Sequence, residues 1–313
     1  MSDWTAITPD TQAFLVQFEA MTRGVPTAVN APIKKLREAR ANGSAALPIV
    51  RLDHGVSAEI PGPAGSIVLR TFTPPNASGA YLHFHGGGFV MGGPDQQDEM
   101  LDRIARDAGM TVVSAGYRLA PEHPFPAAPD DCLASAHWFL DEATAGAFAG
   151  GPLAIGGESA GAYLTTTTLL RLRDEGRGGA FAGVVLSMGA YDLSLTPSAR
   201  NWGDRYALIS TPILKAYIEA FMPGEEDPRS HGRSPLYAHL GDMPPALFTV
   251  GTQDPLLDDT LFMAQRWRAA GNTAELDVYP GGIHAFTAFP IAIARQAAVR
   301  QSSFLAGLKV SAP

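Results

Sequence analysis

The sequence predicts an α/β fold in which a mostly parallel central sheet is flanked by helices on both faces. Short apolar runs alternate with longer helix-forming runs from residue 81 to residue 188, a rhythm typical of repeated strand and helix units. Polar or glycine-rich turns follow several apolar runs, at the carboxyl ends of the predicted strands, where such sheets bind ligands. The 313 residues, 46% of them hydrophobic, are enough to bury a sizeable core.

The composition argues against several kinds of partner. The net charge is −8 and no run of lysine or arginine occurs, so nucleic acid and anionic membranes are not expected to bind. Cys132 is the single cysteine, which rules out an intrachain disulfide. The first residues lack a basic and then apolar stretch, and no apolar run reaches ~18 residues. We therefore expect a soluble cytoplasmic protein without stable membrane association, and a homodimer is left open.

Two amphipathic helices are predicted before any strand. The first covers residues 8–22, with Pro9 in its first turn. Its large apolar side chains recur on one face: Phe14, Leu15, Phe18 and Met21. The second begins after Asn30, with Pro32 in its first turn. Each helix therefore needs an apolar surface to cover.

The pattern changes to strands from residue 50 onward. Two short strands, 50–57 and 66–72, are separated by the turn formers of residues 61–65 and predict a hairpin. Six further strands are predicted at 81–84, 111–115, 153–157, 183–188, 246–250 and 274–279. Helices are predicted at 96–108, at 127–140, from residue 160 onward and at 291–308. The last of these helices is expected to pack on the sheet.

The strand and helix rhythm fails between residues 192 and 235. This insertion contains a predicted helix over residues 212–222, with Thr211 as its cap. It also carries four large aromatic side chains: Trp202, Tyr206, Tyr217 and Phe221. A helical insertion after the carboxyl end of a strand lies over the ligand site, so we expect it to cover the site together with the N-terminal helices. The alternative is a separate surface excursion.

The segment Gly157-Glu158-Ser159-Ala160-Gly161 joins a predicted strand to a predicted helix. A serine hydroxyl is a poor nucleophile unless it is exposed beside a base, and a tight turn at this place provides the exposure. Glycines two residues before and after the serine leave room where the backbones come closest. The pattern alone is weak, because a serine that caps the helix is the alternative interpretation.

The segment His85-Gly86-Gly87-Gly88-Phe89 follows the predicted strand at 81–84. N–H groups in such a loop can point at a developing oxyanion, and this motif accompanies the serine pattern in lipases and esterases. We predict that the N–H groups of Gly87, Gly88 and Ala160 form an oxyanion hole. A phosphate-binding loop is not favoured, since no Gly-Lys-Ser/Thr follows the glycines.

An acid and a histidine follow two later strands. Asp254 comes after the strand at 246–250, and His284 comes after the strand at 274–279 and a Pro-Gly-Gly turn. The order Ser, Asp, His is that of the α/β-hydrolases. Asp258 and Asp259 compete for the role of the acid, although they can instead begin the next helix and favour its dipole. No H-x-x-x-H or C-x-x-C pattern indicates a metal site.

These motifs together resemble the bacterial type of the hormone-sensitive lipase family of α/β-hydrolases. The resemblance extends from about residue 81 to residue 286 and rests on the segments 85–89, 117–128, 157–161, 254–256 and 284–286. It implies an α/β-hydrolase core of residues 46–190 and 236–313 under a helical cap of residues 1–45 and 191–235. Two departures are visible. Glu158 stands where the family commonly has Asp, and Ala162-Tyr163 where it commonly has Gly-Asn.

The resemblance and the motifs predict a carboxylesterase that hydrolyses short- to medium-chain esters through an acyl-enzyme intermediate, without a cofactor or metal. Ser159 attacks the carbonyl, His284 shuttles the proton and Asp254 orients the imidazole. Supporting roles are expected for His85, which would fix the glycine loop, and for Gly86 and Glu158. No catalytic role is expected for His83, His123 and His137.

Other activities stay open at this point. An amidase or a thioesterase would use the same residues, so neither is excluded by the sequence. A ligand-binding module is the third alternative, because some relatives of the family are receptors that keep the pocket and have lost the base. The presence of Ser159, Asp254 and His284 together favours an enzyme.

Overall fold

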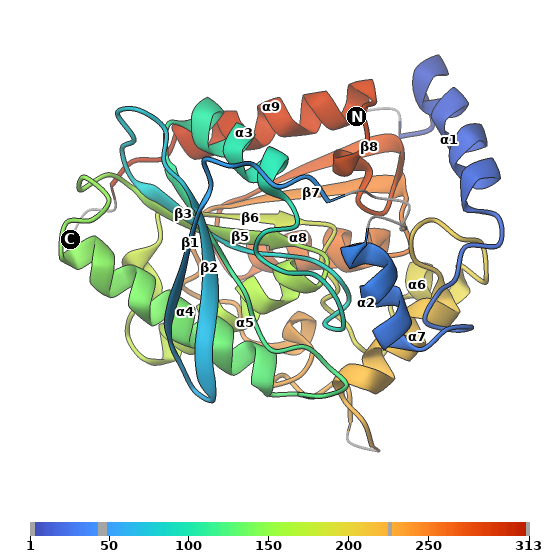
Figure 1. The fold of residues 1–313 in the computed structure, drawn as a ribbon, viewed down its shortest axis with the longest axis horizontal. Coiled ribbons are helices and arrows are strands. Elements are labelled where there is room, and N and C mark those ends of the chain that lie inside the picture. Colours follow the sequence, from blue (N-terminus) through green and yellow to red (C-terminus); the bar gives the residue numbers. More distant parts are fainter. Residues whose placement is uncertain (1–3, 43–48, 225–226, 311–313) are drawn as a thin grey trace.

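The computed structural model describes residues 4–42, 49–224 and 227–310, and one eight-stranded sheet forms its centre (Figure 1). The strands are β1 (Val56–Gly62), β2 (Gly65–Phe72), β3 (Ala80–Phe84), β4 (Thr111–Ala115), β5 (Leu153–Glu158), β6 (Gly183–Ser187), β7 (Ala246–Gln253) and β8 (Ala274–Ile283). Their order across the sheet is β1-β2-β4-β3-β5-β6-β7-β8. β1 and β2 run antiparallel to their neighbours, whereas the strands from β4 to β8 are parallel. The predicted mostly parallel sheet is confirmed.

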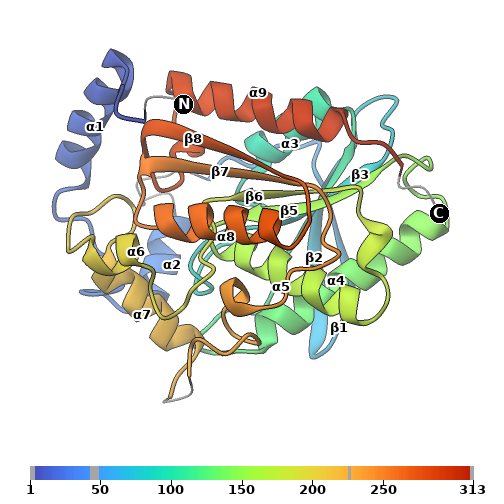
Figure 2. The ribbon, with the colours of Figure 1, turned by 180° about the vertical axis from the view of Figure 1, so that it is seen from behind.

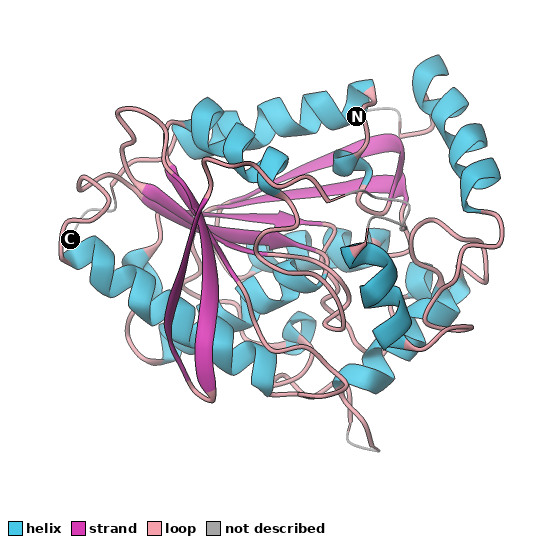
Figure 3. Ribbon diagram, in the orientation of Figure 1, coloured by secondary structure: helices cyan, strands magenta, loops and turns pink. Residues whose placement is uncertain are grey.

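Helices cover both faces of this sheet (Figures 1 and 2). One face carries α3 (Asp98–Ala108) and α9 (Ala292–Ala306), which contact each other. The opposite face carries α4 (Ala127–Thr144), α5 (Ala160–Asp174) and α8 (Leu257–Ala269). Short 3-10 helices occur at η1 (Gly178–Ala180), η2 (Pro235–Tyr237) and η3 (Phe286–Ala288). Figure 3 shows the resulting three layers of helix, strand and helix.

The alternation of side chains along the central strands explains these layers. Successive residues of a strand point to opposite faces of the sheet. Tyr81 accordingly packs with Leu101 and Ile104 of α3, whereas its neighbour Leu82 belongs to the larger cluster that contains Phe139 of α4. Every residue of β3, β4 and β6 is buried, which is why these strands are nearly continuous apolar runs.

The first hairpin differs from its prediction. The strand predicted at 50–57 is wrong, because β1 begins later and continues through Pro61 to a tight turn. Pro61 is tolerated there because β1 is the edge strand of the sheet. The segment before β1 is held by a side chain instead of a strand ladder. Arg70 donates hydrogen bonds to the carbonyls of Leu52 (2.6 Å) and Gly55 (2.7 Å).

The described part of the insertion between β6 and β7 carries two α-helices, α6 (Pro197–Asn201) and α7 (Thr211–Phe221), of which only α7 was predicted. A helix of five residues is too short to leave a periodic signal. The predicted cap at Thr211 is also wrong, because Thr211 is the first residue of α7. Its hydroxyl donates to the Ala199 carbonyl (2.6 Å) and accepts from the Gly203 N–H (3.1 Å), which ties the end of α6 to the start of α7.

The N-terminal helices are α1 (Pro9–Thr22) and α2 (Ile33–Ala41), and both were predicted. The predicted place of Pro32 in the first turn of α2 is wrong, because Pro32 is the N-cap residue. Phe14, Leu15 and Phe18 of α1 pack against the core, but Met21 is 74% exposed, so its predicted place on this face is wrong. The last turn of α1 instead buries Thr22, whose hydroxyl donates to the Phe18 carbonyl (2.7 Å).

The helices α1, α2, α6 and α7 gather at the end of the molecule where the parallel strands have their carboxyl ends (Figures 1 and 2). α1 contacts β8 and α9. It also contacts the insertion, because the rings of Phe18 and Tyr206 stack with centroids 6.1 Å apart. On α2, Arg37 donates to the carbonyls of Val90 (2.5 Å) and Ala120 (2.5 Å). Both N-terminal helices are therefore tied to the loops at this end of the sheet.

Candidate active site

Ser159 occupies a sharp turn between β5 and α5. Its backbone has φ 55° and ψ −120°, a conformation that residues other than glycine rarely adopt. A Cβ atom on Gly157 or Gly161 would lie 2.3 Å or 1.9 Å from the Phe84 carbonyl oxygen, so only glycine fits on either side of the turn. The turn leaves Ser159 partly exposed at the carboxyl end of the sheet.

Ser159, His284 and Asp254 are brought together by the ends of three strands. His284 Nε2 lies 2.9 Å from Ser159 Oγ. His284 Nδ1 lies 2.9 Å from Asp254 Oδ2 and 3.1 Å from Oδ1, so the ring bridges the hydroxyl and the carboxylate. His284 is 5% exposed and Asp254 1%, which shields both contacts from water.

Backbone groups hold the acid and the histidine in place. The Leu256 N–H donates to Asp254 Oδ1 (2.8 Å), which fixes the carboxylate beside the ring. After His284 the chain turns through Ala285, at φ 53°, whose N–H donates to Met188 Sδ (3.0 Å). Met188 lies just past β6 and is fully buried. No pattern in the sequence indicated this sulfur contact.

The two competing acids have other partners. Asp258 Oδ2 accepts a hydrogen bond from the Ser198 N–H (2.8 Å). Asp259 is buried and accepts from the N–H groups of Tyr191 (2.7 Å) and Asp192 (2.9 Å). Both carboxylates therefore hold the insertion against α8. Asp254, of the three, is the one that contacts the histidine.

The glycine loop after β3 can adopt its conformation only with glycine. Gly87 and Gly88 have φ 126° and 61°. A Cβ atom on Gly87 would lie 2.0 Å from the Met91 carbonyl oxygen, and one on Gly88 would lie 2.2 Å from the ring of Tyr217. In the described part of the chain, the N–H groups of Gly87, Gly88 and Ala160 donate to no other residue. These three N–H groups therefore have no acceptor within the described part of the protein.

The chain is similar to known hydrolases. Residues 81–288 match a family model described as the α/β-hydrolase fold. An acetyl esterase of Salmonella schwarzengrund (strain CVM19633) is 31% identical over 234 residues, which are 72% of this chain and 71% of that esterase.

Similar solved structures indicate which family of α/β-hydrolases the chain belongs to. A hyperthermophilic esterase from the archaeon Pyrobaculum calidifontis is 29% identical with a TM-score of 0.86, and a hormone-sensitive lipase from a metagenome library is 28% identical with a TM-score of 0.82. Each alignment covers 96% of this chain and 98% of the other. The chain belongs to the hormone-sensitive lipase family of α/β-hydrolases. The predicted family and fold are confirmed.

His85 of this hydrolase contacts the backbone of the glycine loop. Its ring is buried and stacks on Tyr117 with centroids 4.2 Å apart. Its Nδ1–H donates to the Gly86 carbonyl (2.8 Å), and the Tyr117 hydroxyl donates to the His85 carbonyl (2.7 Å). Burial lowers the pKa of His85 to about 4, so the ring is uncharged at neutral pH. An uncharged ring suits a structural contact with the loop.

Glu158, one of the two departures from the family pattern, also contacts the loop. The Gly86 N–H donates to its Oε1 (2.5 Å), and His83 Nε2 lies 2.8 Å from its Oε2. Burial pushes the pKa of Glu158 upward, but the proximity of His83 and hydrogen bonds from His83, Gly86 and Gln97 outweigh it, so the pKa is below its usual value. The carboxylate is therefore ionised. His83 is a site contact that sequence reasoning missed.

Tyr163, the other departure, fills a space behind the turn. Its buried ring contacts Phe89 of the glycine loop edge-on, and both pack on Phe221 of α7. The Phe89 and Phe221 rings stack with centroids 3.9 Å apart. Tyr163 is larger than the Asn that is common in the family, and its ring joins α5, the glycine loop and the insertion in one aromatic cluster. The contact depends on Phe221, far along the chain, so no local signal predicts it.

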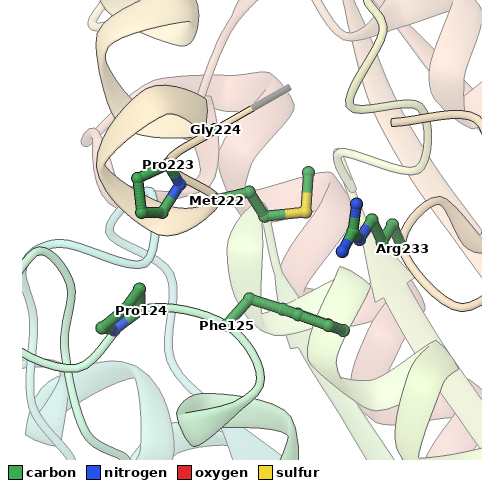
Figure 4. Close-up of a pocket in the computed structure, with 6 residues that line it drawn as sticks. All are labelled: Pro124, Phe125, Met222, Pro223, Gly224 and Arg233. Carbon is green, nitrogen blue, oxygen red and sulfur yellow. The ribbon is translucent and has the colours of Figure 1, made fainter. Parts of the chain in front are cut away.

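Two cavities lie near this end of the molecule. One of about 130 Å³ is lined by Pro124, Phe125, Met222, Pro223, Gly224 and Arg233 (Figure 4). It contains no candidate site residue. The other, of about 600 Å³, lies between α1 and the insertion. Its lining includes Gln253 and Ile283, the residues directly before Asp254 and His284.

Membrane crossing requires a long apolar helix, and metal binding requires a cluster of ligand side chains. Within residues 4–42, 49–224 and 227–310, no helix has both the length and the apolar character that a bilayer crossing requires. The same ranges hold no group of three or more His, Cys, Asp or Glu side chains arranged for a metal ion.

Proposed function

We propose that the protein hydrolyses short- and medium-chain carboxylic esters, with Ser159 as the nucleophile. The contact between Ser159 Oγ and His284 Nε2, at 2.9 Å, carries the proposal, because it joins a partly exposed hydroxyl to a base that can take its proton. Membership of a carboxylesterase family supports it. The acetyl esterase relative supports a small acyl group in particular.

The first half of the reaction forms an acyl-enzyme. Ser159 Oγ attacks the ester carbonyl carbon while His284 Nε2 takes the hydroxyl proton. The negative charge that develops on the carbonyl oxygen is stabilised by the N–H groups of Gly87, Gly88 and Ala160. His284 then gives the proton to the leaving alcohol, and the bond between the acyl carbon and the alcohol oxygen breaks.

The second half releases the acid. A water molecule loses a proton to His284 Nε2 and attacks the acyl carbon, and Ser159 recovers its proton as the acyl group leaves. Asp254 accepts the hydrogen bond from His284 Nδ1–H throughout. It therefore keeps Nε2 free to accept a proton and stabilises the imidazolium that forms.

We also propose that residues 1–45 and 191–235 form a cap over a core of residues 46–190 and 236–313; the boundary between residues 45 and 46 lies outside the described residues. The helices of both segments lie beyond the carboxyl ends of the parallel strands (Figure 1). The stacked rings of Phe18 and Tyr206 join the two segments, and Tyr217 lies against Gly88. The cavity of about 600 Å³ between them has the size of a small-molecule site.

Amides and thioesters would react through the same groups, so ester preference needs a direct comparison. The experiment measures kcat/KM for p-nitrophenyl acetate and butyrate and for the matching anilide and thioester. We expect the esters to be hydrolysed best and Ser159→Ala to lose about 10⁴- to 10⁶-fold in kcat. Ser303→Ala, on the exposed side of α9, is the matched control and should retain full activity.

A covalent probe tests the nucleophile independently of turnover. An organophosphonate should add to Ser159 alone, and peptide mass spectrometry locates the adduct. An adduct on another serine, or full activity in Ser159→Ala, would contradict the proposal. Cytoplasmic location and the choice between monomer and homodimer stay predictions, which cell fractionation and light scattering would test.

A further inference from the structure

His83 is a buried histidine that the proposed reaction does not use. It lies on β3 and is 1% exposed. In the register of the sheet it is paired with Ser114 of β4 on one side and with Gly156 of β5 on the other. A polar ring at this place, between apolar strands, needs hydrogen-bond partners for both nitrogens.

Both ring nitrogens have such partners, and the resulting hydrogen bonds form a series that crosses three strands. Ser114 Oγ lies 3.0 Å from His83 Nδ1, and His83 Nε2 lies 2.8 Å from Glu158 Oε2. An ionised carboxylate only accepts, so Nε2–H donates to Glu158, and in the neutral ring the Ser114 hydroxyl donates to Nδ1. The other carboxylate oxygen accepts from the Gly86 N–H (2.5 Å). This series of hydrogen bonds therefore begins inside the sheet and ends in the glycine loop.

The series of hydrogen bonds ends at Gly86, close to the reacting groups. A Cβ atom on Gly86 would lie 3.3 Å from Glu158 Oε1 and 3.4 Å from Ser159 Cβ, so the loop backbone packs directly on the nucleophile. Gly86 also directly precedes the donors Gly87 and Gly88. A shift of a few tenths of an ångström at Gly86 would move these donors relative to the oxyanion, to which the reaction rate is sensitive.

We propose that His83 and Ser114 are positioning residues, which hold the Glu158 carboxylate and, through its bond to Gly86, keep the oxyanion donors in reacting geometry. The inference rests on the proposed function. Without the His83 donor, the Glu158 carboxylate loses its side-chain partner on the sheet and keeps only Gln97 among its side-chain donors, so it is held less firmly toward the Gly86 N–H. The nucleophile and its base would be unaffected, so the defect falls on transition-state stabilisation and spares substrate binding.

Two substitutions at His83 distinguish a role in positioning Glu158 from a role in packing alone. His83→Phe keeps the ring volume and removes the donor, whereas the amide of His83→Gln can still donate to Glu158. We expect His83→Phe to lower kcat on p-nitrophenyl acetate by roughly 10- to 100-fold with KM changed less than about threefold. His83→Gln should recover most of this loss. His137→Phe is the matched control, because His137 forms a similar pair with Glu175 (3.0 Å) on the surface.

A second measurement uses an alkylboronic acid, whose boron becomes tetrahedral when it adds to the serine and places one of its oxygens in the oxyanion hole. Its affinity should fall in His83→Phe by about the same factor as kcat, and Ser114→Ala should show a smaller loss in both. A rise in KM at constant kcat, equal losses in His83→Phe and His83→Gln, or unchanged boronate affinity would overturn the inference. If His83→Phe does not fold, His83→Gln and Ser114→Ala provide the same comparison.

The proposed function and this inference fail in different ways. Lack of ester hydrolysis by the wild-type protein, or activity in Ser159→Ala, would contradict the function before any His83 variant is measured. Full activity and full boronate affinity in folded His83→Phe would contradict the inference alone.

Discussion

The ring of Tyr217, on α7, lies directly against Gly88 of the glycine loop. A Cβ atom on Gly88 would be 2.2 Å from Tyr217 Cδ2, and the three nearest heavy atoms to it all belong to this ring. The insertion therefore contacts the loop that carries the proposed oxyanion donors. Substitutions at Gly88 and at Tyr217 should consequently affect each other.

Gly88→Ala should be strongly impaired for two separable reasons. The methyl group collides with Tyr217, and alanine at φ 61° is strained by about 1 kcal/mol. We expect kcat to fall by roughly 10²-fold or more as the N–H donors move. Adding Tyr217→Ala removes the collision but leaves the strain, so the double variant should regain part of the activity. Kinetics of the two single variants and the double variant give the coupling.

Gly109→Ala is the control for strain alone. Gly109 has a similar φ, 67°, and a Cβ atom there would meet nothing within 4 Å. This variant should lose a little thermal stability and keep full kcat. If Gly109→Ala were as inactive as Gly88→Ala, or if Tyr217→Ala gave no recovery, the contact between the insertion and the loop would not explain the defect.

Asp254→Asn should cost about 10⁴-fold in kcat, because an amide can donate to His284 Nδ1 and leave the proton on Nε2, where the base is needed. Asp258→Asn is the matched substitution nearby. Its amide oxygen can still accept from the Ser198 N–H, so activity should change less than about threefold. Steady-state kinetics of both variants test the assignment, and the opposite ranking would require Asp258 as the acid.

Asp259 predicts a dependence of stability on pH. Burial raises its pKa from the usual 3.8 to about 7, although hydrogen bonds from Thr196, Asp192 and Tyr191 oppose the change. Between pH about 4 and about 7 the folded state holds a proton that the unfolded state has lost, so the free energy of unfolding falls as pH rises through this window. The loss is on the order of a few kcal/mol.

Asp259→Asn removes this titration while its amide oxygen can still accept from the two N–H groups. Urea unfolding at pH 5 and pH 8 should show the wild type losing stability relative to the variant at the higher pH. Thr196→Val removes a hydrogen bond that lowers the pKa, so it should extend the window to higher pH. A stability difference that does not vary with pH would contradict the prediction.

The length of the acyl chain should have an upper limit. α1 and the insertion meet through the stacked rings of Phe18 and Tyr206, and both rings form part of the wall of the cavity of about 600 Å³ between them. Each methylene that fits contributes about 0.8 kcal/mol, and one that does not fit meets packed side chains. We expect kcat/KM to be higher for p-nitrophenyl acetate, butyrate or octanoate than for palmitate. A value still rising at palmitate would indicate a lipase with a mobile cap.

Phe18→Ala should move this limit toward longer chains, since it removes a ring that lines the cavity between α1 and the insertion. Met21→Ala is the matched control on the same helix, because Met21 is 74% exposed. The ratio of octanoate to acetate kcat/KM measures the effect. An equal ratio in both variants would show that α1 does not limit the acyl chain.

Local patterns in the sequence were enough to predict the mostly parallel sheet and to propose most residues of the candidate site. The strands at residues 81–84 and 111–115 are largely apolar because both faces of the central sheet are buried, and His83, Thr111 and Ser114 are the polar exceptions. The turn at Ser159 and the loop at Gly87 and Gly88 are visible because close backbone approach and positive φ require glycine. Each of these signals comes from residues a few positions apart.

Which of several neighbouring side chains makes a given contact could be seen only in the tertiary structure. Asp254, Asp258 and Asp259 have similar local surroundings in the sequence, and only the packing of β7 against β8 and of the insertion against α8 separates their partners. The start of β1 was missed for a related reason. The ladder with β2 decides which residues pair, and Pro61 is accepted only because the strand is at an edge.

The fold class, the family and the candidate reactive positions along the chain could be predicted from the sequence, because backbone geometry and alternating burial leave short-range patterns. The tertiary structure alone decided which side chains meet: His83 with Ser114 and Glu158, and Tyr163 with Phe221. These contacts join residues that are distant in sequence and depend on strand register and on how the insertion packs, neither of which a local pattern encodes.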